Sequence, residues 1–260
     1  MSQETFLFNK IIFGPLKSRR LGLSLGINLL PLNSKLCNFN CIYCECGLTG
    51  RRGLAKDAFH PAKTVKRDLE EAMIQLKEKN IFPDAITFAG NGEPTIHPEF
   101  SKIIEDTIAL RNMYFPKAKV AVLTNATMLN RSNVVEALKK VDLRILKLDA
   151  GGEELFQKIN QPRSRRSLSW IVDHLQYFKG DLIVQSIFFR GMCNEISVDS
   201  TTVENVTAWL KLLEKIRPRQ VMLYSIDRTP AEKGLERIPD EILEGLAMKV
   251  REMGIDAMVS

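Results

Sequence analysis

Long apolar runs are missing from this 260-residue sequence. No window approaches eighteen uninterrupted apolar residues, and the opening MSQETFLFNK lacks the basic-then-apolar order of a signal peptide. Cysteine is also scarce, and five cysteines, three of them close together, do not make a disulfide framework. We therefore expect a soluble cytoplasmic protein that makes no membrane contact and works in a reducing compartment.

Long blocks of one charge are missing as well. Charged residues make up 26% of the chain, and the net charge is +6. A modest basic excess suits a nucleic acid or a phosphorylated or carboxylated substrate. With 45% hydrophobic residues the chain can bury a substantial core. We expect one domain over residues 1–260, with a partial barrel over 27–260 and an N-terminal extension over 1–26 packed on it.

The cysteines that are present have an informative spacing. Cys37, Cys41 and Cys44 form a C-x3-C-x2-C array after an apolar segment typical of a strand. Three thiolates can bind three irons of a 4Fe-4S cluster and leave the fourth iron open to a ligand that is not protein. Two other interpretations stay open: structural cysteines on one helical face, disfavoured by the nearby asparagines and Pro31, and a zinc site completed by Cys46.

The segment CNFNCIYC, in which Tyr43 directly precedes the third cysteine, resembles the signature of the radical S-adenosylmethionine (radical SAM) superfamily. The resemblance implies that Cys37, Cys41 and Cys44 bind a 4Fe-4S cluster, with Tyr43 beside the bound cofactor. It also implies that the amino and carboxylate groups of SAM chelate the open iron. Reductive cleavage of SAM would then give a 5′-deoxyadenosyl radical that abstracts hydrogen from a substrate.

The flanking segments narrow this resemblance. The sequence before the array reads GPLKSRRLGLSLGINLLP, and the sequence after it reads ECG. Both are similar to a radical SAM subgroup related to the wyosine synthases, which act on a guanosine of transfer RNA. Many members of that subgroup are standalone domains, and the resemblance leaves their substrates open.

Apolar periodicity predicts six strand-helix units in regular alternation. After the segment preceding Cys37, the expected strands are residues 84–90, 119–123, 144–149, 182–189 and 220–226. Strands separated by crossover helices are parallel and have right-handed connections. The expected fold class is therefore α/β, a partial (β/α)6 TIM-type barrel of the radical SAM type with a short N-terminal hairpin. Residues 255–259 are expected to add a seventh strand or to cover an edge.

Polar residues follow two of the expected strands. Asn91, Gly92 and Glu93 resemble the GGE motif of the superfamily, which contacts the methionine amino group of the cofactor, with Asn91 replacing the first glycine. Thr124 and Asn125 follow the next strand and could bond a ribose, or could simply form a turn. Catalytic groups of α/β barrels lie at the carboxyl ends of their strands, so we expect all five residues to contact the cofactor.

Charges also occur inside the expected strand 144–149. Alternation places Lys147 and Asp149 on its inner face, with Leu146 and Leu148 toward the helices. The two charges either pair with each other or contact a cofactor or substrate. We expect Asp149 to accept ribose hydroxyls or to orient the substrate.

Further polar candidates lie later in the chain. Gln185 and Ser186 are expected to contact the cofactor through whichever of them faces inward. Arg228 is expected to bind a carboxylate or phosphate of the substrate unless it pairs with a neighbouring aspartate. Arg19 and Arg20 could bind an anionic group or remain solvated, and the basic segment 159–166 could contact phosphate.

These residues together predict a radical SAM enzyme whose substrate is a transfer-RNA base, a small molecule or peptide, or a partner enzyme activated as a glycyl radical. A non-enzymatic module that binds zinc and RNA is a further alternative. No auxiliary cluster or flavin domain is recognisable, so we expect an external electron donor of flavodoxin or ferredoxin type. In such enzymes the protein supplies binding and orientation, and the cofactor supplies the chemistry.

Overall fold

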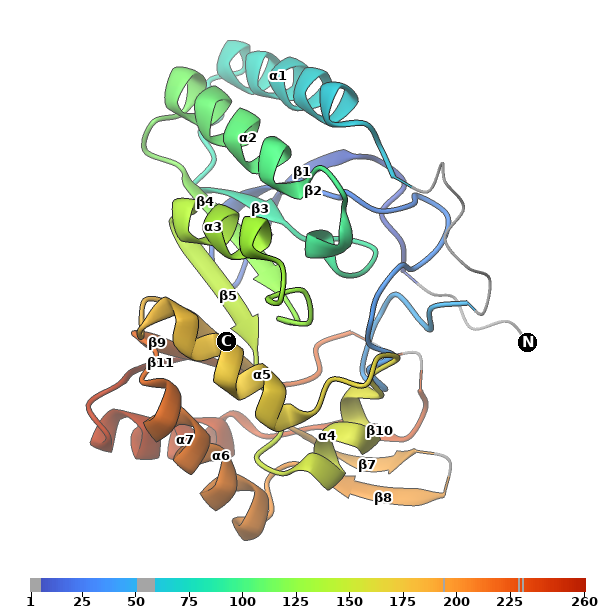
Figure 1. Cartoon of the computed structure of the whole chain (residues 1–260), viewed down its shortest axis with the longest axis vertical. Coiled ribbons are helices and arrows are strands. Elements are labelled where there is room, and N and C mark those ends of the chain that lie inside the picture. Colours follow the sequence, from blue (N-terminus) through green and yellow to red (C-terminus); the bar gives the residue numbers. More distant parts are fainter. Residues whose placement is uncertain (1–5, 51–58, 194, 229, 231) are drawn as a thin grey trace.

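The computed structural model describes residues 6–50, 59–193, 195–228, 230 and 232–260. An eight-stranded sheet with the order β1-β2-β3-β4-β5-β6-β9-β11 forms its centre. The sheet curls into a partial barrel (Figure 1), and seven of its strands are parallel, from β2 across to β11. The expected fold class is confirmed. The strands are β1 Ile12–Ser18, β2 Gly22–Ile27, β3 Ala85–Phe88, β4 Lys119–Thr124, β5 Leu143–Lys147, β6 Ile183–Ile187, β9 Gln220–Tyr224 and β11 Asp256–Val259.

Helices cover the outer face of the sheet. Figure 1 shows α1, α2 and α3 over one half of the sheet and α5, α6 and α7 over the other half. Each helix returns the chain to the amino end of the next strand, which is why neighbouring strands are parallel. The helices are α1 Ala62–Glu78, α2 Phe100–Tyr114, α3 Ser132–Lys140, α4 Glu153–Asn160, α5 Leu168–Leu175, α6 Val203–Ile216 and α7 Asp240–Glu252, with short 3-10 turns at Pro94–Ile96 and Gln176–Phe178.

The N-terminal hairpin belongs to the sheet. Strand β1 is antiparallel to β2, and β2 is parallel to β3. The expected division after residue 26 therefore falls inside β2, and residues 12–26 extend the barrel sheet rather than only packing on it. Gly26 weakens the local strand signal, but a side chain there would collide with the ring of Phe13, since a Cβ atom would lie 2.1 Å from it.

Several elements were not expected from the sequence. A second sheet of three strands has the order β10-β7-β8 and lies beside α4 (Figure 1). The expected strand 182–189 is divided between β6 and the first residue of β7. The strands of this second sheet are β7 Phe189–Cys193, β8 Ile196–Asp199 and β10 Leu235–Arg237.

The main core lies between the sheet and the helices. Outward-facing strand residues such as Ile86, Phe88 and Leu146 are fully buried in one apolar cluster. A smaller apolar cluster, built around Ile145 and Met222, lies on the other face of the sheet inside the barrel. Within the described residues, no helix combines the length and apolarity needed to cross a membrane.

Candidate active site

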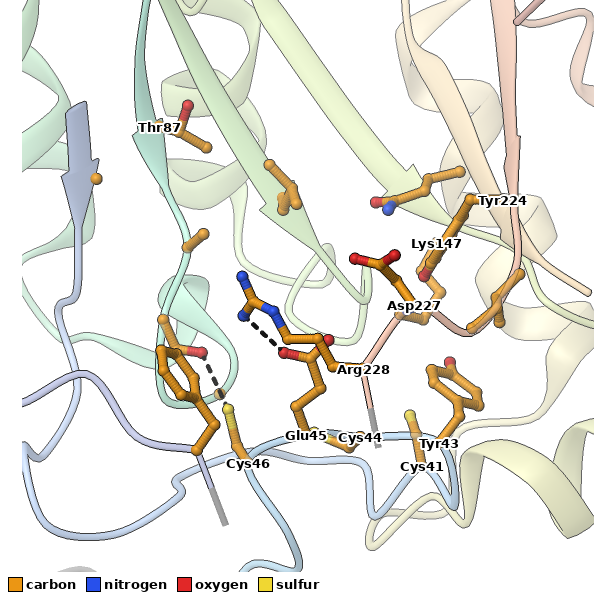
Figure 2. Close-up of a pocket in the computed structure, with 18 of the residues that line it drawn as sticks. Cys41, Tyr43, Cys44, Glu45, Cys46, Thr87, Lys147, Tyr224, Asp227 and Arg228 are labelled. Carbon is orange, nitrogen blue, oxygen red and sulfur yellow. Dashed lines mark hydrogen bonds and ion pairs between the residues drawn. The ribbon is translucent and has the colours of Figure 1, made fainter. Parts of the chain in front are cut away.

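A cavity of about 550 Å³ lies inside the barrel and reaches the carboxyl ends of the strands. Residues 28–47, which we call the cysteine loop, follow β2 and border this cavity. Figure 2 shows Cys41, Tyr43, Cys44 and Cys46 along the cysteine loop, below the strand ends. Cys37, Cys41 and Cys44 all line the cavity, so the structure brings the three expected metal ligands to one place.

The cysteine loop is held on two sides by backbone pairing. On one side Leu36 bridges to Gly92, and the Leu36 amide donates to the Asn91 carbonyl at 2.8 Å. On the other side Phe39 bridges to Pro162, and the Ile42 amide donates to the Ile159 carbonyl at 3.0 Å. The loop between the three cysteines is therefore fixed to β3 on one flank and to the end of α4 on the other.

The cysteine sulfurs receive N–H donors from the protein. The Phe39 amide lies 3.4 Å from Cys37 Sγ, and Asn125 Nδ2 lies 3.5 Å from the same sulfur. Asn160 Nδ2 lies 3.5 Å from Cys41 Sγ. Such donors stabilise negative charge on sulfur. Three cysteine sulfurs border one cavity, and amide groups support those of Cys37 and Cys41. This donor set fits a 4Fe-4S cluster.

A buried lysine compensates the charge of the thiolates. Lys35 donates to the Gly47 carbonyl at 2.7 Å, which folds its side chain back over the cysteine loop. Burial alone would lower the pKa of Lys35, but the thiolates of Cys44, Cys37 and Cys41 raise it. Lys35 was missed in the sequence, although a lysine two positions before a metal-binding cysteine is a recognisable signal.

The four thiols of the cysteine loop differ in their affinity for protons. Burial raises the pKa of Cys37 to about 12. A hydrogen bond from Cys46, supported by Lys35, lowers the pKa of Cys44 to about 5, and the same hydrogen bond raises the pKa of Cys46. These contacts favour the thiolate form of Cys44 over that of Cys46.

The structure also bears on the zinc alternative. Cys46 Sγ points toward the Gly90 carbonyl at 3.6 Å. Among the residues that the structure describes, no three His, Cys, Asp or Glu side chains are close enough to hold a single metal ion. In this structure Cys46 Sγ therefore has the Gly90 carbonyl as its backbone partner.

In the turn after β3, residues 90–93, Gly92 and Asn91 have different structural roles. Gly92 has φ +139°, and a Cβ atom there would lie 1.8 Å from the Leu36 carbonyl oxygen, so this position requires glycine. Asn91 is buried and donates through Nδ2 to the Phe8 and Pro31 carbonyls at 2.9 and 2.8 Å. Asn91 therefore ties the N-terminal segment to the cysteine loop, and it is not among the described residues that line the cavity.

Glu93 joins the two expected cofactor segments. Its Oε1 accepts from the Thr124 hydroxyl at 2.6 Å, and its Oε2 accepts from the Asn125 amide at 2.6 Å. All three residues line the cavity. Burial raises the pKa of Glu93, although these hydrogen bonds oppose the shift. The sequence-based grouping of Glu93, Thr124 and Asn125 thus corresponds to one hydrogen-bonded cluster next to Cys37.

Asp149 lies beneath the cysteine loop. Its buried carboxylate accepts from the Tyr43 hydroxyl and from Asn160 Nδ2 at 2.7 Å, and Lys147 Nζ lies 3.4 Å away. Asp149 is not among the described residues that line the cavity, whereas Lys147 is. The charges of Lys147 and Asp149 pair with each other, and Asp149 also holds the Tyr43 hydroxyl. Asn160 was missed because α4 was not expected.

The remaining candidates divide between the two faces of the sheet. Gln185 lines the cavity. Ser186 faces outward, where it donates to the Leu148 carbonyl and accepts from Trp209 Nε1 at 3.0 Å. Arg228 lies at the mouth of the cavity and pairs with Glu45, with Nη1 3.0 Å from Oε2 (Figure 2). Of Gln185 and Ser186, Gln185 is therefore the residue that faces the cavity.

A sequence profile of the Radical SAM superfamily matches residues 34–187, which include the cysteine loop and strands β3 to β6. The chain belongs to the radical SAM superfamily. It is accordingly an enzyme, and membership implies SAM and an iron-sulfur cluster as cofactors, together with an electron donor and a substrate.

Relatives of this radical SAM chain span its length. A UPF0026 protein of Methanocaldococcus jannaschii is 30% identical over 237 residues, which cover 90% of this chain and 68% of that protein. A protein of Brachyspira hyodysenteriae named GTPase Obg is 29% identical over 242 residues, which cover 92% of this chain. The radical SAM chain spans only 33% of that second relative.

Solved structures share the radical SAM fold. SuiB of Streptococcus suis bound to S-adenosylmethionine has a TM-score of 0.64 at 14% identity, covering 90% of this chain and 50% of SuiB. A radical SAM methyltransferase of Sphaerobacter thermophilus has a TM-score of 0.68 at 15% identity, covering 91% of this chain and 65% of the methyltransferase. At these identities the likeness concerns the partial barrel itself.

Proposed function

We propose that this radical SAM enzyme cleaves SAM reductively with a 4Fe-4S cluster bound by Cys37, Cys41 and Cys44, and abstracts hydrogen from a substrate inside the barrel. One observation supports the proposal most directly. The three cysteine sulfurs line the same cavity as the hydrogen-bonded cluster of Glu93, Thr124 and Asn125, at the carboxyl ends of the strands. When bound and reduced, the cluster supplies the electron that cleaves the sulfonium of SAM and gives a 5′-deoxyadenosyl radical.

The cavity-lining residues of β3 and β4 are assigned to the cofactor. Gly92 lets the backbone approach a ligand closely, and the carboxylate of Glu93 suits the methionine amino group of SAM. Thr124 and Asn125 are assigned to the ribose. Gln185 faces the cavity from β6 and is assigned to the adenosyl part.

Other residues act by positioning. Lys35 offsets the negative charge of the thiolates, and Asn125 and Asn160 orient the sulfurs of Cys37 and Cys41. Asp149 holds Tyr43 and so fixes the cysteine loop relative to β5. We assign this positioning role to Asp149 in place of a direct contact with the cofactor or substrate.

The substrate proposed is a base of transfer RNA. The basic segment 159–166 lies against the cysteine loop, where the Arg163 amide donates to the Asn38 carbonyl at 2.8 Å. The guanidinium of Arg166 lies 4.1 Å from the centre of the Trp170 ring. Positive charge next to an aromatic ring suits RNA, and the resemblance of the flanking segments to the wyosine-related subgroup supports the same class.

An external flavodoxin or ferredoxin is proposed as the electron donor, with residues 1–260 acting as one catalytic domain in the cytoplasm. Arg228 at the cavity mouth, already paired with Glu45, is proposed to release that carboxylate when an anionic group of the substrate binds.

The cluster assignment is tested with Cys37→Ala, purified anaerobically and reconstituted beside the wild type. We expect the wild type to contain iron and sulfide and to release 5′-deoxyadenosine from SAM on reduction. The variant should lose both, because one iron loses its protein ligand. Zinc without sulfide in the wild type, or full SAM cleavage by the variant, would overturn the proposal.

The substrate class is tested separately with deuterium. The reduced enzyme is incubated with SAM and either a uniformly deuterated transfer-RNA pool or a deuterated small-molecule pool. Hydrogen abstraction from RNA should place deuterium in 5′-deoxyadenosine only with the first pool. Label from the second pool alone would reject RNA as the substrate while leaving the radical chemistry intact.

A further inference from the structure

The cavity is lined by more cations than carboxylates. Among the residues that the structure describes, the lining includes six cationic side chains and three carboxylates, and Lys35 among the cations is directed to the thiolates. The cations are Lys17, Arg19, Arg20, Lys35, Lys147 and Arg228, and the carboxylates are Glu45, Glu93 and Asp227. An anionic ligand would offset this imbalance.

Three of the cations already have carboxylate partners. Arg228 pairs with Glu45 at 3.0 Å, Arg19 pairs with Asp227 at 3.4 Å, and Lys147 pairs with buried Asp149 at 3.4 Å. Arg20 differs from these three, because no ion pair joins it to any residue in the part of the chain that the structure describes.

The guanidinium of Arg20 is held in place and partly unsatisfied. Its carbon lies 4.6 Å from the centre of the Tyr224 ring, and its Nη1 is buried without a hydrogen-bond partner among the described residues. Leaving a charged donor buried without an acceptor is costly. An acceptor from a bound ligand would remove that cost.

The turn that carries Arg20 is fixed by its neighbouring residues. Arg20 lies in the turn between β1 and β2, and its amide donates to the Ser18 hydroxyl at 3.3 Å. The next residue, Leu21, packs against the apolar cluster inside the barrel. The turn is thereby anchored, and Arg20 extends toward the end of β9 rather than into solvent.

We propose that Arg20 binds a carboxylate or phosphate group of the substrate inside the barrel. This inference rests on the proposed function, and it adds that the part of the substrate inside the barrel carries an anionic group. A guanidinium presents parallel N–H groups that match the two oxygens of a carboxylate or phosphate. Lys147 also lines the cavity, where its charge is paired with the buried carboxylate of Asp149.

The carboxylate of SAM itself is a second source of such an anionic group, so the test has two arms. In the first arm, inorganic phosphate is titrated into the cluster-free full chain, and binding is followed by phosphorus NMR line broadening. Arg20→Gln is compared with Arg19→Gln, which changes the adjacent and more exposed arginine. We expect Arg20→Gln to weaken phosphate binding about tenfold or more, because a hydrogen bond to a charged group is lost. Arg19→Gln should stay within about twofold of the wild type, since Asp227 already satisfies that residue.

In the second arm, SAM binding is measured by equilibrium dialysis with the cluster-loaded wild type and Arg20→Gln. Unchanged SAM affinity together with weakened phosphate binding supports a substrate site. An equal loss of SAM affinity would assign Arg20 to the cofactor carboxylate and overturn the inference. Phosphate binding that is absent from the wild type or insensitive to Arg20→Gln would also overturn it.

Two controls distinguish a loss of phosphate binding from misfolding of the variant and from failure of the radical SAM reaction. Circular dichroism and thermal melting show whether Arg20→Gln folds, and Arg20→Lys replaces it if it does not. Arg20→Lys keeps the charge but lacks the paired N–H groups, so we expect phosphate binding between those of the wild type and the glutamine variant. The phosphate arm requires neither cluster nor SAM, so failure of the radical SAM reaction leaves its result unaffected.

Discussion

The two faces of the barrel strands have different compositions, and β3 shows the contrast in adjacent residues. Phe88 faces the helices, is fully buried, and packs edge-to-face against Phe100 with ring centres 6.2 Å apart. Thr87 faces the cavity and shares a hydrogen bond of 2.6 Å with Ser24 of β2. One face of the strand therefore supplies the core, and the other supplies part of the site.

The same division recurs on β5. Leu146 and the following Leu148 are buried in the main apolar cluster, whereas Lys147 lines the cavity. Apolar burial contributes most of the stability of such a sheet, so the inner face is free to carry polar groups that a ligand or water can satisfy. The outer faces of the strands therefore supply most of the core, whereas the inner faces combine the smaller apolar cluster with the residues of the site.

The largest effect is expected from breaking the outer face. Phe88→Ala should lower the free energy of unfolding by about 3–5 kcal/mol, because it leaves a cavity in a packed core. Its neighbour provides the matched control: Thr87→Ala removes one hydrogen bond and should cost only about 1 kcal/mol. Urea unfolding of both variants measures the difference. Equal losses would show that the inner face also supports the fold, and the proposed division between the faces would be wrong.

A smaller effect is expected where the cysteine loop meets β5. Tyr43→Phe removes the hydroxyl that donates to the buried carboxylate of Asp149 and links the cysteine loop to β5. Asn160 and Lys147 remain as partners, so the free energy of unfolding should fall by about 1–3 kcal/mol. Iron content after reconstitution should fall with it if the link positions the cysteines.

The control for this change is Tyr177→Phe, because Tyr177 is 50% exposed and far less constrained. Urea unfolding and iron analysis should leave that variant equal to the wild type. A Tyr43→Phe protein with unchanged stability and iron content would show that Asp149 does not act through Tyr43.

Much of the fold could be predicted because the relevant signals are local. The strands expected at 84–90 and 220–226 contain β3 and β9, and the strand expected at 119–123 lies within β4, since apolar periodicity and strand length are properties of neighbouring residues. The start of helix α6 shows the limit of local signals: the Thr202 hydroxyl caps the helix by accepting from the Asn205 amide, whereas the adjacent Thr201 hydroxyl donates to Asp199. Choosing between two adjacent threonines depends on the turn that precedes the helix.

The second sheet could not be predicted in the same way. Strands β7, β8 and β10 have five, four and three residues, which is too short for a clear alternation. Strand β10 also pairs with β7 across more than forty residues of chain, as in the register of Arg237 with Phe189. Such pairing is decided by where the rest of the barrel places both segments.

The sequence by itself determined the cysteine spacing, the alternation of strands and helices, and the inward position of Lys147, because each depends on residues close together in the chain. Only the tertiary structure decided which partner each polar group has. It turned Ser186 toward Trp209, placed Asp149 beneath Tyr43, and left Arg20 Nη1 buried inside the barrel without an acceptor among the described residues. These outcomes depend on contacts between distant segments, which a local pattern does not contain.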